Sequence, residues 1–342
     1  MACPPIEQLE QGFRVLSKEE KGSASKTVLV FGRLDGRAVA LKIFAQRGAA
    51  RAGLLKEVRL YKRVTELLRR GVTLNVVRYV GDWVCAARAL APLGALPREL
   101  GGRVGVLATE RVLGPSVNEA LHEQRLGADA LLSVLFQVVH AMGNLSTAGI
   151  RHADLHTGNV LLEPQPQRAT PFRARLDGVV AYWRLPTPWL AKIFDWDFGD
   201  LDDDALPNAH AAPHCARYDL CGHNDKADLY TFLDSVWLKT KKRPRYTAIA
   251  ETIERWIALP LLEAGATDGL FARRGGMAKR LCRGPIADDR CPAVETLYNC
   301  AGPWRPPDCQ MLPPAAMLAD EVFRRWRVDA LPDAWGTTVE FF

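Results

Sequence analysis

The order of strand-like and helix-like segments predicts an α+β protein with two lobes. Strand patterns dominate residues 1–113, with one helix among them, and helical apolar spacing dominates the longer part that follows. Strands followed by helices, rather than an alternation of the two, indicate a small antiparallel sheet and a larger, mainly helical part. We therefore expect domains at 1–113 and 114–342, with a divergent C-terminal tail from about residue 284.

Length and composition are those of a globular protein. The 342 residues can bury a large core, and a 48% hydrophobic content argues against wholesale disorder. The net charge of +6 suits an anionic ligand such as a nucleotide, but it gives no reason to expect nucleic acid as a partner. Eight cysteines are too few for a disulfide scaffold in a chain this long, which predicts mostly reduced thiols. With no leader-like segment and no apolar run of membrane length, we expect an intracellular, cytoplasmic protein without a membrane partner.

Local patterns place the individual elements. Residues 34–37 read as a hairpin turn between two apolar strand patterns, and Gly149 is placed to end a helix. The expected strands are 28–31, 38–44, 75–84, 104–113 and 191–194, and the expected helices are 51–70, 127–148, 226–238 and 246–263. An inserted loop is expected at 86–103, and a proline-rich stretch at 164–188 has no assigned element.

The strongest functional signal is the sequence H-A-D-L-H-T-G-N-V-L at residues 152–161. Phosphoryl transfer needs a carboxylate beside the attacking hydroxyl and an oxygen ligand for the metal on the phosphates. Asp154 and Asn159 lie five residues apart on one tight loop between an expected helix and a strand, so they offer both groups. A chance polar loop after a helix is the alternative interpretation.

This loop resembles the catalytic loop of the protein kinase superfamily. Its H-x-D-L-H-x-G-N motif most resembles the corresponding motif of divergent Ser/Thr protein kinases of large DNA viruses and of phosphotransferases of the aminoglycoside- and choline-kinase type. The resemblance implies a two-lobed protein-kinase-like fold that uses ATP and Mg²⁺. It also implies that Asp154 takes the proton of the acceptor hydroxyl and that Asn159 binds magnesium.

A second kinase-like element precedes the loop. The V-A-L-K sequence at residues 39–42 resembles the strand whose lysine, here Lys42, neutralises the α- and β-phosphates, and Glu57 stands where the family places the paired glutamate. Gly22 and Ser23 belong to a degenerate phosphate-covering loop that keeps only the central glycine of three. A solvated strand lysine is the alternative, and the spacing to Glu57 and Gly22 favours the kinase interpretation.

Two aspartates compete for the second metal position. An apolar strand that ends in Asp is expected there, and either Asp195 or the D-F-G sequence that starts at Asp197 fits. Because the strand 191–194 runs directly into Asp195, we expect Asp195 to bind magnesium. Trp196 would then take the packing position of the family's phenylalanine.

Residues 107–112 resemble the adenine-binding hinge of this family. The resemblance implies that the Glu110 carbonyl and the Val112 amide pair with the base. It also implies that Ala40 and Leu161 cover the two faces of the ring. The end of a buried strand is the alternative interpretation.

Asp228 falls where the family has a helix aspartate that braces the catalytic loop, although the helix dipole also favours a carboxylate at a helix N-terminus. Ala153 replaces the arginine that clamps a phosphorylated activation loop, and the Ala-Pro-Glu motif is absent. These departures leave regulation and substrate class open.

A histidine- and cysteine-rich cluster follows the metal-binding aspartates. Thiolates together with imidazoles suggest zinc, but their spacing matches no zinc knuckle, so a zinc site is the less favoured interpretation. The members of the cluster are His210, His214, Cys215, Cys221 and His223.

The leading interpretation is a Ser/Thr-type protein kinase, of the kind that large DNA viruses encode, which transfers the ATP γ-phosphate to a protein hydroxyl in the host cell or virion. One alternative is a small-molecule kinase of the aminoglycoside- or choline-kinase type, which the catalytic-loop wording favours. The other is a pseudokinase scaffold, which the degenerate glycine loop supports and the complete set of catalytic residues opposes. The protein substrate and the oligomeric state are left open.

Overall fold

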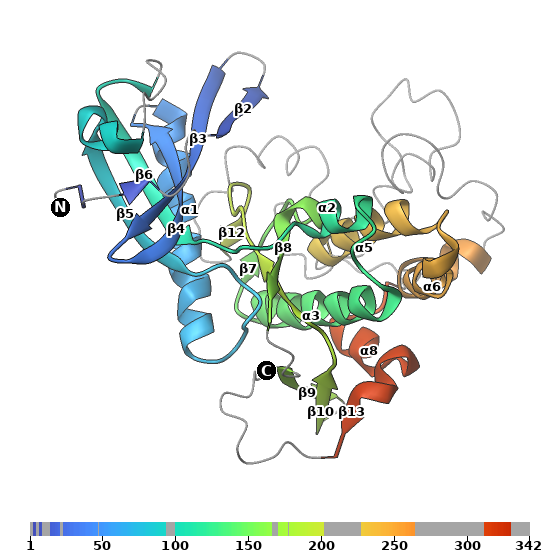
Figure 1. The fold of residues 1–342 in the computed structure, drawn as a ribbon. Coiled ribbons are helices and arrows are strands. Elements are labelled where there is room, and N and C mark those ends of the chain that lie inside the picture. Colours follow the sequence, from blue (N-terminus) through green and yellow to red (C-terminus); the bar gives the residue numbers. More distant parts are fainter. Residues whose placement is uncertain are drawn as a thin grey trace, which may run out of the picture. The chain divides into compact units, whose positions relative to one another are not determined.

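The computed structural model describes most of the chain. The described residues are 3–4, 7–8, 14–20, 23–46, 48–93, 100–165, 170–176, 178–201, 227–263 and 311–329. The chain forms two compact units, Met1–Glu66 with Val77–Leu113 and Leu67–Val76 with Gly114–Phe342. Figure 1 shows the elements of both units. The assignment of 1–113 and 114–342 as the two lobes of a kinase stays a prediction.

The first unit is built on an antiparallel sheet with the strand order β1-β3-β4-β6-β5, in which β2 also pairs with β3. The strands are β1 (Glu7–Gln8), β2 (Arg14–Glu20), β3 (Ser23–Leu34), β4 (Arg37–Ala45), β5 (Tyr79–Ala86) and β6 (Arg103–Glu110). Asp35 and Gly36, with φ of 47° and 75°, form the two-residue turn between β3 and β4 that the sequence predicts. Most of helix α1 (Gly48–Arg69) also belongs to this unit.

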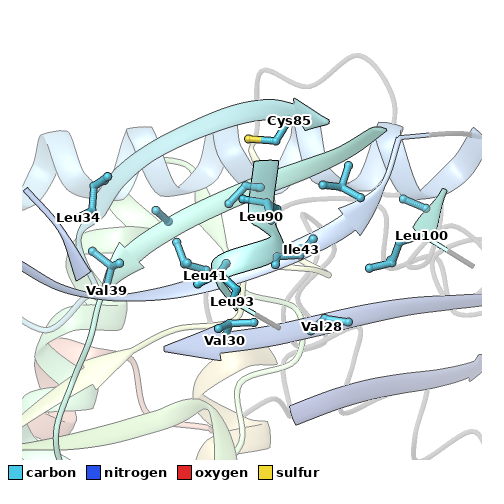
Figure 2. Packing of buried hydrophobic residues seen from close by; sticks show 14 residues of the cluster. Val28, Val30, Leu34, Val39, Leu41, Ile43, Cys85, Leu90, Leu93 and Leu100 are labelled. Carbon is cyan, nitrogen blue, oxygen red and sulfur yellow. The ribbon is translucent and has the colours of Figure 1, made fainter. Parts of the chain in front are cut away.

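The core of the first unit lies against this sheet (Figure 2). Side chains two positions apart on a strand point to the same face of the sheet. Leu41 and Ile43 of β4 therefore share one face, and both are fully buried. The 3-10 helix η1 (Ala87–Leu93) adds two buried leucines to the same cluster. The expected insertion at 86–103 therefore contributes to the core and is more than a loop.

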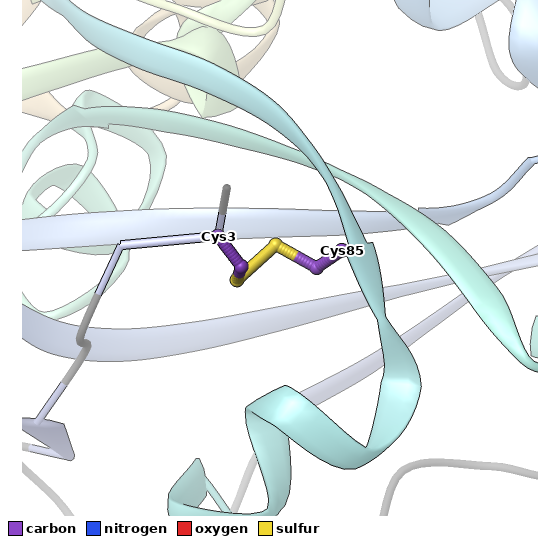
Figure 3. The surroundings of a disulfide bond; sticks show 2 residues. All are labelled: Cys3 and Cys85. Atoms are coloured by element: carbon purple, nitrogen blue, oxygen red, sulfur yellow. A yellow bond between two sulfur atoms is a disulfide. The ribbon is translucent and has the colours of Figure 1, made fainter. Parts of the chain in front are cut away.

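A disulfide bond joins Cys3 to Cys85 near the end of β5 (Figure 3). The two residues are separated by 82 positions in the sequence, and Cys85 is buried in the core cluster. The bond therefore ties the N-terminal segment to the sheet. The expectation of mostly reduced thiols is wrong for this pair, because pairing depends on which thiols the fold brings together and not on the number of cysteines.

The second unit is mainly helical. Its helices include α2 (Val117–His122), α3 (Ala128–Thr147), α5 (Ala227–Thr240) and α6 (Thr247–Glu263), with the 3-10 turn η4 (Pro244–Tyr246) before α6. The expected helices after residue 114 are confirmed, and Gly149 has the left-handed φ of 70° expected after α3. Among the helices of the described ranges, α3 alone is long and apolar enough to cross a membrane, but 83% of its apolar window is buried, as in a core helix.

Short strands of the second unit frame the motif segment. They are β7 (Ile150–Arg151), β8 (Val160–Pro164), β11 (Trp189–Ile193) and β12 (Asp200–Leu201), with the 3-10 turn η3 (Thr157–Asn159) before β8. β8 pairs with β11 and β7 with β12, each antiparallel. The expected strand at 75–84 is divided, because Val76 makes a parallel bridge to Ile193 and only the later residues enter β5.

An inserted hairpin occupies the proline-rich stretch for which the sequence predicts no element. It consists of β9 (Thr170–Leu176) and β10 (Val179–Leu185), and β13 (Arg327–Val328) from the C-terminal tail pairs with β10. The tail reaches β13 through α8 (Pro314–Ala319) and the 3-10 helix η6 (Glu321–Trp326). The remainder of the tail from about 284 lies outside the described residues.

The α+β class is confirmed. An antiparallel sheet forms the N-terminal part, and helices dominate the described residues of the C-terminal part.

Cys3→Ser is expected to lower the free energy of unfolding of the first unit by about 2–5 kcal/mol under non-reducing conditions, because the cross-link restricts the unfolded chain. Denaturant titration of the full chain, followed by fluorescence, measures this. With reductant present, wild type and variant should unfold at the same denaturant concentration. A difference that persists in reductant would show that the bond is not the source of the stabilisation.

Candidate active site

Lys42 and Glu57 form a buried ion pair in the first unit. Strand β4 directs Leu41 and Ile43 into the core, so Lys42 projects from the other face, and α1 supplies Glu57. Lys42 Nζ donates to both carboxylate oxygens of Glu57, at 2.9 Å and 3.1 Å, and the two side chains are 13% and 1% exposed. A buried carboxylate without a partner is strongly destabilising, so the pair holds the lysine in place. Binding of phosphates by Lys42 stays a prediction.

The residues expected to bind adenine lie in strands or directly after a strand. Ala40 of β4 pairs with Thr109 of β6, which ends at Glu110, and Val112 follows two residues later. Leu161 lies in β8 of the second unit. Their joint action on one base stays a prediction.

Two sets of candidates include residues outside those that the structure describes. Gly22 lies outside the described residues, whereas Ser23 is the first residue of β3 and is paired with Glu20 of β2. The histidine- and cysteine-rich cluster at 210–223 also lies outside them, so the zinc interpretation stays open.

In the second unit, Asp228 of α5 holds the start of the loop at residues 152–159. Its Oδ2 accepts from the His152 backbone N–H and its Oδ1 from that of Ala153, each at 2.7 Å. Asp228 is buried, so these charge-assisted bonds are shielded from solvent. They fix a backbone in which Ala153 has the left-handed φ of 60°. The structure thus shows the bracing that the position of Asp228 predicts.

His152 connects this loop to the strand that carries the candidate metal ligand. The ring is buried; its Nε2 donates to the Phe194 carbonyl at 2.8 Å, and its Nδ1 accepts from the Asp154 N–H at 3.4 Å. Trp196 is also buried, with its ring centroid 4.7 Å from that of His152. Trp196 therefore packs against the loop.

Asp195 has a strained backbone beside this loop. Its neighbour Phe194 is bonded on both sides, because its N–H donates to the Asn159 carbonyl at 3.1 Å and its own carbonyl accepts from His152. Asp195 has a φ of 64°, a conformation that costs a residue with a side chain roughly 1–2 kcal/mol. Strain of this kind is concentrated at functional sites. The choice of Asp195 over Asp197 as the metal ligand stays a prediction.

Asp154 and Asn159 present complementary groups. Asn159 Nδ2 donates to the Asp154 carbonyl at 2.8 Å, which leaves the Asn159 Oδ1 as the oxygen that can bind a cation. The Asp154 carboxylate is 41% exposed, whereas Asn159 is only 6% exposed. An exposed carboxylate can meet an acceptor from solution, and a buried amide is held in one orientation. Amide and carboxylate oxygens, here from Asn159 and Asp195, are ligands that magnesium accepts, so these residues fit the ion.

His156 shapes the turn between these two residues. Its Nδ1 accepts from the Gly158 N–H at 2.9 Å, and its Nε2 lies 3.8 Å from Asp154 Oδ2. A Cβ at position 158 would lie 2.7 Å from the His156 ring, so any larger residue there would displace this ring. The Thr157 N–H donates to Ser235 Oγ of α5 at 3.0 Å, which ties the turn to the same helix as Asp228.

A buried polar network was not predicted from the sequence. Asn75 Nδ2 donates to Gln137 Oε1 at 3.0 Å and to the Ala191 carbonyl at 2.8 Å. Gln137 Oε1 also accepts from the Ala191 N–H at 2.9 Å, and both polar side chains are fully buried. The network fixes β11, which leads to Asp195. Its signal in the sequence is the single glutamine within the apolar face of α3.

No protein-family model and no curated protein matches this chain. Among solved structures, the kinase domain of PF14_0431 is similar to it, with 14% sequence identity and a TM-score of 0.46 over 94% of this chain and 98% of that domain. The functional assignment therefore rests on the residues and contacts of this chain alone.

The two aspartates are expected to respond differently to neutralisation. Asp195→Asn should lower magnesium-dependent ATP hydrolysis by roughly 100-fold or more, because a charged ligand placed beside the loop is lost. Asp197→Asn should cost much less and serves as the matched control. Initial rates over a magnesium titration measure both. A folded Asp195→Asn protein that keeps the wild-type rate while Asp197→Asn loses it would reverse the assignment.

Proposed function

We propose that this chain is a magnesium-requiring, ATP-dependent phosphotransferase. The observation that carries the proposal is the loop in which the buried Asp228 fixes the backbone that presents Asp154 and Asn159. One exposed carboxylate and one rigid amide oxygen are the groups that phosphoryl transfer to a hydroxyl needs. The buried Lys42–Glu57 pair adds support, because it supplies a fixed positive charge of the kind that binds phosphates.

Each of the candidate residues would have its own part in the chemistry. ATP would supply the γ-phosphoryl group, with magnesium neutralising the charge on its oxygens. Asp154 would orient the acceptor hydroxyl and take its proton as the acceptor oxygen bonds to the γ-phosphorus and the bond to the ADP oxygen breaks. Asn159 Oδ1 and Asp195 would hold the metal, and Lys42 Nζ would bind the phosphates.

We propose a serine or threonine hydroxyl of a protein as the acceptor. The Lys42–Glu57 pairing supports a protein kinase, whereas the H-x-D-L-H-x-G-N wording supports a small-molecule kinase as the second candidate. The same motif supports a relationship to kinases of large DNA viruses. A pseudokinase is the weaker alternative, because its loop would not need both an exposed carboxylate and a metal-binding amide.

Lys42→Met is expected to lower phosphotransfer by roughly 100-fold or more, because a positioned charge is lost. Since the change also leaves the buried Glu57 carboxylate without its lysine, rates are compared only for protein that circular dichroism shows to be folded. The assay follows the labelled γ-phosphate of ATP with casein, a basic protein, an aminoglycoside and choline as acceptors. Lys242→Met, at an exposed position, is the matched control and should keep the wild-type rate.

The identity of the labelled acceptor separates the candidates. Label on protein supports the leading proposal, and label on the aminoglycoside or choline alone supports the small-molecule kinase. A folded wild-type protein that neither transfers nor hydrolyses the γ-phosphate would contradict both. Wild-type turnover by Lys42→Met would contradict the role of the lysine.

A further inference from the structure

Residues 195–199 form most of the connection between β11 and β12, and Asp195 is the first of them. The start of this connection is held by hydrogen bonds. The Phe194 N–H donates to the Asn159 carbonyl at 3.1 Å, and the Phe194 carbonyl accepts from His152 at 2.8 Å. The backbone just before the candidate metal ligand is therefore fixed to the loop that carries Asn159.

An ion pair holds the other end of the connection. Arg151 of β7 and Asp200 of β12 lie opposite each other in an antiparallel pair of strands. Arg151 Nη2 donates to Asp200 Oδ2 at 2.9 Å, and the two side chains are 14% and 5% exposed. Asp200 Oδ1 accepts from the Leu201 N–H at 3.1 Å, which orients the carboxylate. Each strand has only two residues, so the ion pair reinforces a junction with few backbone hydrogen bonds.

Arg151 is itself attached to the anchored part of the loop. It directly precedes His152, whose backbone N–H donates to the buried Asp228. The ion pair therefore fastens Asp200 to the same short segment that presents Asp154. Both ends of the connection are thus held by one preorganised loop.

We infer that the Arg151–Asp200 ion pair positions the Asp195 carboxylate for magnesium. The inference rests on the proposed function, since it concerns the metal site of that reaction. Asp195 has a φ of 64°, from which a residue with a side chain would relax if the connection were free at one end. With both ends held, the carboxylate keeps its place beside the Asn159 loop. Groups that orient a metal ligand without touching the metal change metal affinity or activity by about 10- to 100-fold when they are mutated.

A salt bridge that only stabilises the fold would behave differently. Its loss would lower the amount of folded protein, and hence the maximal rate, at every magnesium concentration. Loss of a positioning pair instead weakens the affinity of folded protein for the metal, so the metal concentration for half-maximal rate rises and saturating metal restores much of the rate. Metal affinity measured on folded protein therefore separates the two roles.

The test measures manganese binding by the full chain at a saturating concentration of a non-hydrolysable ATP analogue. Mn²⁺ accepts the same oxygen ligands as magnesium, and protein-bound Mn²⁺ enhances the relaxation of water protons, so the readout needs no phosphotransfer. Arg151→Met and Asp200→Asn are each expected to weaken manganese binding about tenfold or more. The double variant should bind no more weakly than the single variants, because either change already removes the pair. Arg151→Lys keeps the charge and should retain most of the affinity.

Arg255→Met is the matched control, because it breaks another arginine–aspartate ion pair of the second unit, that with Asp320. It should leave manganese binding unchanged. Circular dichroism selects folded protein. Asp200→Asn leaves no carboxylate buried without its partner charge, so it covers the case in which Arg151→Met fails to fold.

Weaker manganese binding in Arg151→Met and Asp200→Asn, with no further loss in the double variant, supports the inference. Wild-type affinity in folded Asp200→Asn would overturn it, and so would an equal loss in Arg255→Met. Neither result would touch the proposed function. Conversely, a wild-type chain that binds manganese with the analogue but neither transfers nor hydrolyses the γ-phosphate would contradict the proposed function alone.

Discussion

The buried carboxylate of Asp228 is the constraint on which the candidate site depends. Its two oxygens accept the consecutive backbone N–H groups of His152 and Ala153, which no helix or sheet satisfies. The left-handed backbone of Ala153 costs free energy, and these bonds keep it in place. Asp228 is itself held by the packing of α5, whose Leu229 and Phe232 are fully buried. The hydrophobic packing of α5 therefore positions Asp228, and Asp228 in turn fixes the backbone of the polar loop.

Hydrogen bonds connect this part of the loop to the candidate metal ligands. His152 bonds the Phe194 carbonyl, and the Phe194 N–H bonds the Asn159 carbonyl, so the loop and the end of β11 hold each other. The buried Gln137 fixes the first half of β11, because its Nε2 donates to the Trp189 carbonyl and its Oε1 accepts from the Ala191 N–H. Preorganised groups of this kind pay their ordering cost during folding and not during the reaction.

The sequence was sufficient to predict those features that depend on short motifs and their spacing. The spacing of Lys42 and Glu57 predicted a strand lysine paired with a helix glutamate, and the spacing of the 152–161 motif predicted the loop between a helix and a strand. The β9–β10 hairpin was not predicted, because prolines obscure its alternation and its third strand comes from the distant tail. The Cys3–Cys85 bond and the Asn75–Gln137 network were missed for the same reason, since each depends on contacts far apart in the sequence.

The most direct test of the account is magnesium-dependent ATP hydrolysis by Asp228→Asn, an assay that needs no known acceptor. One amide oxygen cannot replace two carboxylate oxygens, so the loop should loosen and the rate should fall roughly 100-fold, as small displacements of catalytic groups do. Glu251→Gln, at an exposed position of α6, removes the same charge and should keep the wild-type rate. A folded Asp228→Asn protein that hydrolyses ATP at the wild-type rate would contradict the claim that this carboxylate organises the site.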